Sequence, residues 1–391
     1  MTKVLISGAS IAGPALALWL GRNGYDVTVV EKAPLVRPGG QAVDFKGRTQ
    51  RRVLDRMGIW DDIVAAQTPR TDIRFVDANG RVKVVMPGEF TGGDVEILRG
   101  DLATVLHAHA APHARFVFDD EIVRLEQSEA GVEVGFAGGG TESYDLVIGA
   151  DGIHSAVRSL AFGPESDHVH PQGYYYAVVD ASVSADGLVT ELPGGRAVGY
   201  GYNEPGRYAV LGGPKAPLLF VFSADEARYD RRDVDSQKRF LADHYRGAGW
   251  RVPELVDAAL EAPDFYLDGL ARTTMTTFTK GRTALVGDAG YANTLGGFGT
   301  GLALIGSYVL AGELVAHGGD HVAAFAAYDQ RMAHLTKSAR RTNAGPFLAP
   351  PSPLRIRMRD LTFANRLTVG AMLKVTDWFA TDEKVPDYSL A

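Results

Sequence analysis

The sequence predicts an α/β protein in which a doubly wound sheet is interrupted by a mainly antiparallel sheet and followed by a C-terminal helix. Lys3–Ser7 is a short apolar run, Pro14–Arg22 favours helix, and Asp26–Val30 is rich in β-branched residues. A strand, a helix and a second strand in this order are typical of the start of a doubly wound sheet. Between about residues 170 and 224, aromatic and β-branched segments separated by Gly and Pro indicate antiparallel strands. The stretch Leu354–Phe379 indicates one or two terminal helices.

Composition argues against several classes of protein. The chain has 391 residues, of which 46% are hydrophobic and 22% are charged, as in globular proteins of two or three packed units. The net charge of -7 argues against a nucleic-acid partner. Because there is no cysteine and the 10 histidines show no metal-ligand spacing, we expect neither a disulfide nor a metal. No secretory signal begins the chain and no apolar run approaches the roughly 20 residues of a membrane helix, so we expect a cytoplasmic protein without a membrane span.

The first motif is Gly8–Gly13, which follows the first strand and opens the first helix. Gly8 allows a tight turn, and Gly13 allows the helix to pack closely on the strand. The free N–H groups at the start of the helix, near Ala12, can bind a pyrophosphate. Ser10 stands where the Rossmann-like fingerprint usually has its second glycine. The motif predicts a dinucleotide site, and a tight turn without a nucleotide is the alternative.

Glu31 ends the second strand, 18 residues after Gly13. A carboxylate at this place can accept hydrogen bonds from the ribose hydroxyls of an adenosine. It would also repel a 2′-phosphate, so the site should hold FAD or NAD and not NADP. The alternative is a solvated carboxylate at the end of a strand.

Two further motifs place glycine and aspartate after apolar strands. In Asp145–Arg158, the strand runs into Asp151-Gly152, where Asp151 can cap the next helix; a strand–turn–helix junction without function is the alternative. In Arg282–Gly301, the strand runs into Gly287-Asp288 and then into a loop with five glycines in 12 residues. The helix that starts after this loop can stabilise negative charge on a bound ring, and Asp288 can accept a hydrogen bond from a ribityl hydroxyl.

The three motifs, in this order, resemble those of the class A FAD-dependent aromatic hydroxylases, the family typified by para-hydroxybenzoate hydroxylase. The resemblance covers roughly residues 1 to 345 and is strongest to the tetracycline-inactivating flavin monooxygenases. Gly39–Asp44 resembles a segment of that branch whose aspartate contacts FAD, and Ile97–Leu102 resembles one whose arginine, here Arg99, contacts the flavin side chain. The alternative for Arg99 is an ion pair with a nearby carboxylate. Arg37 falls where the branch has an arginine linked to the nicotinamide nucleotide.

The resemblance implies most of the expected site. The expected FAD-binding residues are Gly8, Ser10, Ala12, Gly13, Glu31, Lys32, Asp44, Arg99, Asp151, Asp288, Gly299, Thr300 and Gly301. The expected substrate-binding residues are Tyr176, Tyr200, Phe222 and Phe298, for which ordinary sheet packing is the alternative. No catalytic side chain is assigned, because the flavin carries the chemistry. The family usually has Ala-His and prolines after Gly-Asp, whereas this chain continues Ala289-Gly290-Tyr291, which puts the orientation of the substrate in question.

The resemblance also implies the activity. NAD(P)H reduces the flavin, oxygen forms a C4a-hydroperoxide, and this species hydroxylates a bulky aromatic or polycyclic substrate. Whether the donor is NADPH or NADH stays open, and we expect a monomer or a weak homo-oligomer. The alternatives are an FAD oxidoreductase without oxygen insertion, such as a prenyl-chain reductase, and a non-catalytic flavin-binding or ligand-binding relative. A flavin-dependent halogenase is disfavoured because the signature Trp-x-Trp-x-Ile-Pro is absent.

The expected units are discontinuous along the chain. The FAD-binding domain is expected to comprise residues 1–70, 96–168 and 276–345. The substrate-binding domain is expected to comprise residues 71–95 and 169–275, and a C-terminal helical segment residues 346–391.

Overall fold

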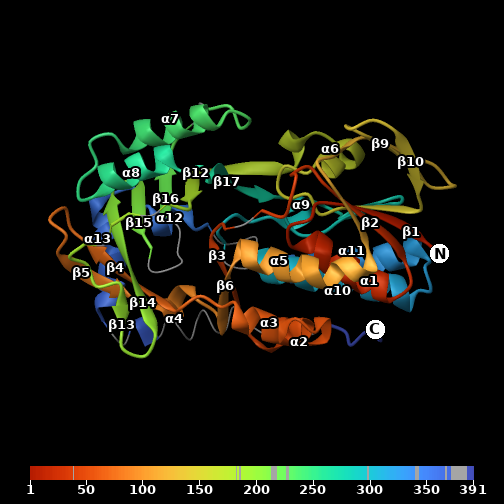
Figure 1. Cartoon of the computed structure of the whole chain (residues 1–391), viewed down its shortest axis with the longest axis horizontal. Coiled ribbons are helices and arrows are strands. Elements are labelled where there is room, and N and C mark those ends of the chain that lie inside the picture. The colour runs from red at the N-terminus through yellow and green to blue at the C-terminus, as the bar shows by residue number, and fades with distance from the viewer. Residues whose placement is uncertain are drawn as a thin grey trace.

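The computed structural model describes residues 1–37, 39–181, 183–184, 186–212, 218–225, 229–296, 299–339, 343–365, 368–370 and 385–391. Within these residues, the strands form a six-stranded, an eight-stranded, a three-stranded and a two-stranded sheet. Figure 1 shows the six-stranded sheet with its helices at one end of the molecule and the eight-stranded sheet at the other.

The six-stranded sheet contains the first strands of the chain. Its order is β18-β19-β11-β1-β2-β7, and all neighbours are parallel except β18 and β19. The bounds are β1 Lys3–Ser7, β2 Asp26–Glu31, β7 Arg115–Phe118, β11 Leu146–Gly149, β18 Thr279–Lys280 and β19 Thr283–Leu285. The three-stranded sheet consists of β8 Ile122–Gln127, β9 Val132–Phe136 and β10 Thr141–Tyr144. Both sheets contribute to one hydrophobic core, which explains why β1 and β2 are apolar along most of their length.

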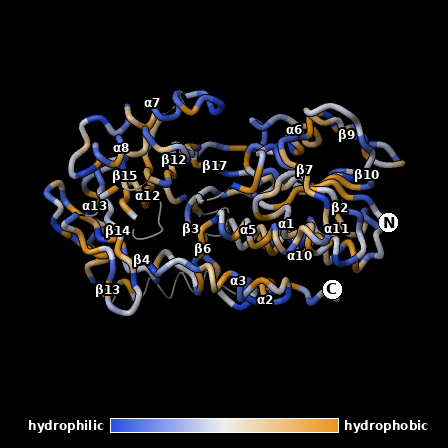
Figure 2. Tube along the Cα trace, in the orientation of Figure 1, coloured by the Kyte–Doolittle hydropathy of each residue, from blue (hydrophilic) through white to orange (hydrophobic). Residues whose placement is uncertain are grey.

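Four helices pack together in this part of the molecule: α1 Ala12–Arg22, α5 Arg99–Ala110, α10 Gly299–Ala316 and α11 His321–Ala339. Among the described residues, α10 is the one helix long and apolar enough to cross a membrane, but 72% of that window is buried inside the protein. Its apolar character is therefore accounted for by its place in the core. In Figure 2, the strands near the β2 and β7 labels are largely apolar, whereas α2 and α3 mix apolar and polar residues.

The eight-stranded sheet has the order β17-β12-β16-β15-β14-β4-β5, with β13 beside β14, and all pairs except β14 with β4 are antiparallel. The bounds are β4 Thr71–Val76, β5 Val82–Met86, β12 Val169–Val179, β13 Glu191–Leu192, β14 Arg196–Glu204, β15 Arg207–Leu211, β16 Leu218–Ser223 and β17 Phe265–Thr273. One face packs against α7 Val234–Tyr245 and α8 Val252–Glu261. The other face packs against α12 Gly345–Leu348 and α13 Pro353–Ala364.

The remaining elements are short. They are β3 Ala42–Phe45 paired with β6 Val95–Leu98, α2 Arg48–Met57, α3 Trp60–Ala65, α4 Gly88–Thr91, α6 Ala156–Phe162, α9 Asp288–Tyr291, and the 3-10 helices η1 Ala111–His113 and η2 Glu165–Asp167.

The predicted fold class is confirmed: a doubly wound sheet and a mainly antiparallel sheet are both present. The expected helix over Leu354–Phe379 is observed as α13 up to Ala364, and residues 371–384 lie outside the described residues. The last seven residues return to the six-stranded sheet and its helices. There, Val385 joins the hydrophobic core, and Arg52 donates a hydrogen bond to the Val385 carbonyl at 2.9 Å.

Candidate active site

The glycine turn between β1 and α1 is built for close approach of the backbone. Gly8 has a φ of 106°, and a Cβ on it would collide with the carbonyl oxygen of Ala150. A Cβ on Gly13 would collide with the carbonyl oxygen of Gly8, so the first turn of α1 lies directly on the loop. Among the described residues, no side chain caps the start of α1. Its first N–H groups are therefore available to the pyrophosphate of a dinucleotide.

Glu31 reaches back from the end of β2 to this turn. Its Oε2 accepts the Ala9 N–H at 2.8 Å, and its Oε1 accepts the Ala33 N–H at 3.0 Å. The carboxylate is thus fixed beside the glycine turn, at the place where the fingerprint has its ribose acceptor.

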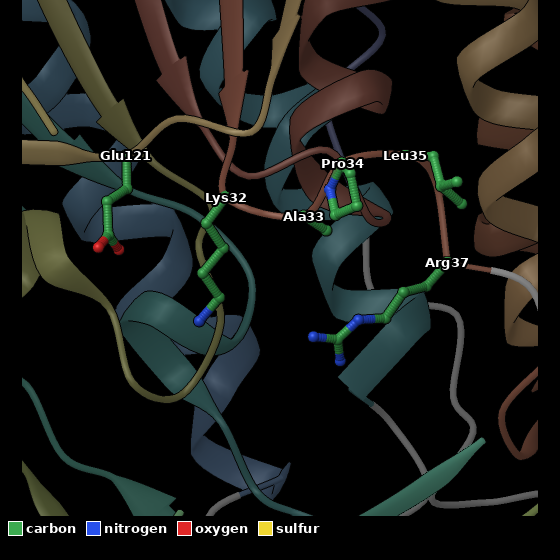
Figure 3. Close-up of a pocket in the computed structure, with 6 residues that line it drawn as sticks. All are labelled: Lys32, Ala33, Pro34, Leu35, Arg37 and Glu121. Atoms are coloured by element: carbon green, nitrogen blue, oxygen red, sulfur yellow. The ribbon is translucent and has the colours of Figure 1, made fainter. Parts of the chain in front are cut away.

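Beyond Glu31, the loop borders an open pocket of about 560 Å³. Its lining residues are Lys32, Ala33, Pro34, Leu35, Arg37 and Glu121. Figure 3 shows Lys32 and Arg37 extending from this loop toward the same side, with Glu121 across from Lys32. Two cationic side chains at one pocket provide a suitable environment for an anionic group.

Asp151 lies next to the same turn. Its Oδ2 accepts the Ser7 Oγ–H at 3.3 Å and the Val157 N–H at 3.1 Å. Because Val157 lies in the first turn of α6, Asp151 contributes to capping this helix, together with the N-cap residue Ser155, which accepts the Arg158 N–H at 2.9 Å. Asp151 also accepts the Ser155 hydroxyl. Burial raises the pKa of Asp151, and the Ser155 hydroxyl opposes the rise.

Helix α10, which begins in the third motif, Arg282–Gly301, packs against α1, which begins in the first motif, Gly8–Gly13. The Ser307 hydroxyl donates to the Ala12 carbonyl at 3.0 Å, which holds α10 against α1. Asp288 Oδ1 lies 3.7 Å from the position that a Cβ on Gly299 would take, at the first turn of α10. Thr300 is half-buried in that turn, and Gly301 lies against the Gln50 side chain.

Arg99 joins the first and third motifs. Its Nη2 donates to Ser10 Oγ at 3.3 Å, at the glycine turn. Burial raises the pKa of Asp288, and the positive charge of Arg99 opposes this rise. Arg99 is therefore close enough to influence both a pyrophosphate at the turn and a carboxylate at the start of α10.

Asp44 faces a second carboxylate. It lies on β3, directly opposite Glu96 on the antiparallel strand β6. Burial and then repulsion from Glu96 raise the pKa of Asp44 to about 7. A cofactor hydroxyl that donates to Asp44 would offset this unfavourable arrangement.

The expected substrate residues are divided between the two faces of the eight-stranded sheet. Tyr176 lies on the face that also packs against Leu295 of the third motif. Tyr200 and Phe222 lie on the opposite face with the α7 and α8 residues, so the structure does not bring them together with Tyr176. The reason is strand alternation: each strand presents successive side chains to opposite faces. Phe298 lies outside the described residues.

Sequence reasoning missed the role of Arg158. This side chain is fully buried, and its Nη1 donates to the Ala289 carbonyl at 2.9 Å while its Nη2 donates to the Ile153 carbonyl at 2.5 Å. Arg158 therefore connects the second motif, through Ile153, with the third motif, through Ala289. The available signal was an arginine within the mostly apolar helix α6.

It also missed a cluster at the boundary between the two large sheets. His154 Nδ1 lies 3.0 Å from Glu165 Oε2, and His154 Nε2 lies 3.2 Å from Asp268 Oδ2. Burial lowers the pKa of His154, but the stronger combined effect of Asp268 and Glu165 raises it overall. Nothing local in the sequence pairs residue 154, in the loop before α6, with residue 268 on β17.

Comparison with known proteins agrees with this geometry. A model of the FAD binding domain family matches residues 1–338. A flavin-dependent monooxygenase from an unknown prokaryotic organism is 40% identical over 336 residues, which is 84% of this chain and 85% of the relative. A flavin-dependent monooxygenase from Legionella longbeachae is 37% identical over 343 residues, which is 84% of each. The crystal structure of tetracycline destructase Tet(55) is 35% identical with a TM-score of 0.81, covering 99% of each chain.

The chain belongs to the FAD binding domain family, and it is an FAD-dependent monooxygenase. The predicted resemblance to the class A flavin monooxygenases and the prediction of FAD as cofactor are thereby confirmed.

Proposed function

We propose that this monooxygenase consumes NAD(P)H and hydroxylates a bulky aromatic or polycyclic substrate, through the flavin C4a-hydroperoxide that the family resemblance implies. The substrate class is supported by the similarity to a tetracycline destructase and by the aromatic face around Tyr176. The use of a nicotinamide nucleotide is supported by Arg37, which lines an open pocket beside the expected adenosine end of the cofactor site. The cytoplasmic location and the monomeric or weakly oligomeric state stay predictions.

One observation supports this function best: Asp151 contacts the end of β1 through Ser7, Arg99 contacts the glycine turn through Ser10, and Leu295 of the third motif packs on the sheet face that carries Tyr176. In this proposal, α1 and Arg99 hold the pyrophosphate, and Glu31 holds the adenosine ribose. Asp44 and Asp288 accept hydrogen bonds from the sugar-like hydroxyls of FAD. The sheet face then encloses the reacting ring and excludes water from it.

The test is oxidation of NADPH and of NADH by the FAD-loaded protein in the presence of a panel of polycyclic phenols. We expect one compound to accelerate oxidation and to gain one oxygen atom that derives from labelled O2, as measured by mass spectrometry. Arg37→Ala should raise the KM for the nucleotide by about tenfold, the typical effect of losing one charge-assisted hydrogen bond. Arg232→Ala, a change on an exposed turn, is the matched control.

A protein that accepts electrons but never inserts oxygen would overturn the proposed hydroxylation and favour the oxidoreductase alternative. A protein that hydroxylates with another electron donor would overturn only the use of NAD(P)H.

A further inference from the structure

Helix α13 is apolar on two opposite faces. Its inner face carries the buried Ile356 and Phe363, and Phe363 belongs to the core of the eight-stranded sheet. Its outer face carries Leu354, Met358 and Leu361, which are 67%, 58% and 61% exposed. These three residues, spaced by four and then three positions, form one line along the helix, which we call the α13 stripe. A helix that is apolar all round normally lies between two apolar layers, and the described residues provide only the inner one.

Two cations border the α13 stripe, and no exposed carboxylate of the helix accompanies them. With 3.6 residues per turn, Arg355 and Arg357 lie on opposite sides of the stripe, and both are exposed. The one acidic residue of α13, Asp360, is buried and pairs with Arg359 at 2.8 Å and with Lys83 of β5 at 3.0 Å. The outer face of α13 is therefore apolar in the middle and positive along both edges, on a chain whose net charge is -7.

The α13 stripe lies away from the cofactor motifs. Helix α13 packs against the edge strand β5, and Figure 1 shows both elements at the end of the molecule opposite the N-terminus. The exposed residues of β5 are Val82, Lys83 and Val85, so this strand adds no negative charge. A partner that docks at this end therefore meets apolar and positive side chains and does not have to reach the glycine turn.

We propose that the outer face of α13 docks on the surface of a bilayer that contains anionic phospholipids. An interfacial helix places its apolar residues at the boundary between headgroups and acyl chains, and cations beside them are attracted to the lipid phosphates. The α13 stripe, with Arg355 and Arg357 at its edges, matches both requirements. A second copy of the chain fits less well, because a two-fold contact would bring the arginines of both copies together without an exposed carboxylate of α13 to pair with them.

The docking is expected to be reversible and dependent on charge. A basic residue near an anionic lipid surface contributes about 1 kcal/mol, or about fivefold in affinity, so the loss of both arginines should weaken binding about 25-fold. The loss of one leucine of the stripe should weaken binding about tenfold, the lower end for burial of such a side chain. Because salt screens exposed charges, binding should also fall as the salt concentration rises.

The experiment is co-sedimentation of the FAD-loaded full chain with sucrose-loaded vesicles. One set of vesicles consists of phosphatidylcholine alone, and in the other set about one third of the lipid is phosphatidylglycerol. We expect the wild type to bind the anionic vesicles and not the neutral ones. The double variant Arg355→Gln, Arg357→Gln and the single variant Leu354→Ser should each bind the anionic vesicles more weakly, by the factors given above. All three side chains are exposed, so both variants should keep the FAD content and the Tm of the wild type.

Matched variants make the same chemical changes elsewhere on the surface. The double variant Arg239→Gln, Arg246→Gln removes two exposed charges at α7, and Val322→Ser removes an apolar side chain on α11 that is 68% exposed. Both should bind the anionic vesicles as the wild type does.

A fluorescent label reports directly whether the stripe enters the lipid. The chain has no cysteine, so Met358→Cys provides a single attachment site for a polarity-sensitive fluorophore. We expect its emission to move to shorter wavelength when anionic vesicles are added. The same label at Val322→Cys should not respond.

The proposal is overturned if the wild type does not bind the anionic vesicles, or if the variants of α13 bind them as tightly as the matched variants do. A mass by light scattering that corresponds to two chains in the wild type and to one chain in Leu354→Ser would assign the stripe to a second copy and would equally overturn it. A protein that binds the vesicles through α13 but never hydroxylates a substrate would overturn the proposed function and leave this surface intact.

Discussion

Gly13 lies against the carbonyl oxygen of Gly8 so closely that any Cβ on Gly13 would overlap it. Gly13→Ala must therefore displace α1 from the glycine turn. We expect a loss of about 3 kcal/mol in the free energy of unfolding, the upper end for overpacking, together with loss of most bound FAD. Thermal unfolding and the flavin absorbance of the purified protein measure both effects. Gly370→Ala is the control, because a Cβ there meets no atom within 4 Å among the described residues; equal FAD content in both variants would contradict the prediction.

Arg158→Met should destabilise the protein without touching the cofactor. The change removes the donors to the Ala289 and Ile153 carbonyls. Because a buried polar group without its partner costs about 1–3 kcal/mol, we expect a loss of at least roughly 2 kcal/mol in the free energy of unfolding. Urea denaturation measures it, and Arg124→Met, on the exposed strand β8, should change stability far less. Arg158→Lys restores at most one of the two contacts, so its free energy of unfolding should lie between that of the wild type and that of Arg158→Met.

The stability of the FAD-free protein should fall as the pH rises from the ordinary carboxyl pKa of 3.8 to about 7, the raised pKa of Asp44. Burial and then repulsion from Glu96 disfavour the ionised carboxylate, so the contribution of Asp44 to stability is complete below pH 3.8 and is lost across this window. Asp44→Asn should remove this part of the pH dependence, as measured by the Tm across the window. Asp61→Asn, an exposed change on α3, should leave it in place. A parallel pH profile of Asp44→Asn and the wild type would refute the assignment.

His154 should stabilise the fold at low pH. Its folded-state pKa is raised above the ordinary value of 6.5, so its contribution is complete below that value and is lost as the pH rises through the folded-state pKa. We expect the difference in Tm between the wild type and His154→Gln to become smaller as the pH rises through the folded-state pKa of His154. A difference that stays constant with pH would mean that the charge of His154 contributes nothing to the contact with Asp268 and Glu165.

The sequence allowed the order of the early elements and the cofactor motifs to be predicted, because these depend on local patterns. The apolar run of β1, the glycines at positions 8 and 13, and Glu31 lie within one strand–helix–strand unit. In β12, Tyr174 and Tyr176 lie on one face of the sheet and Tyr175 on the other, as the two-residue period of a strand requires.

What the sequence could not provide depends on contacts between distant segments. Alternation states which residues share a face but not which face is turned toward the flavin site, so Tyr200 and Phe222 were grouped with Tyr176. The contact of His154 with Asp268 joins residues 114 positions apart, and the pairing of Asp44 with Glu96 requires the register of β3 and β6. None of these relationships has a local signature.

The return of the last seven residues has a consequence for the rest of the fold. Tyr388 packs against Gly312 on α10, and the Ala391 N–H reaches Asn23 at 3.3 Å, so both chain ends are held by the same half of the molecule (Figure 1). The eight-stranded sheet is built from two internal stretches, β4–β5 and β12–β17, and neither chain end belongs to it. A change of length in the loops of this sheet would therefore not have to disturb the contacts that anchor the ends.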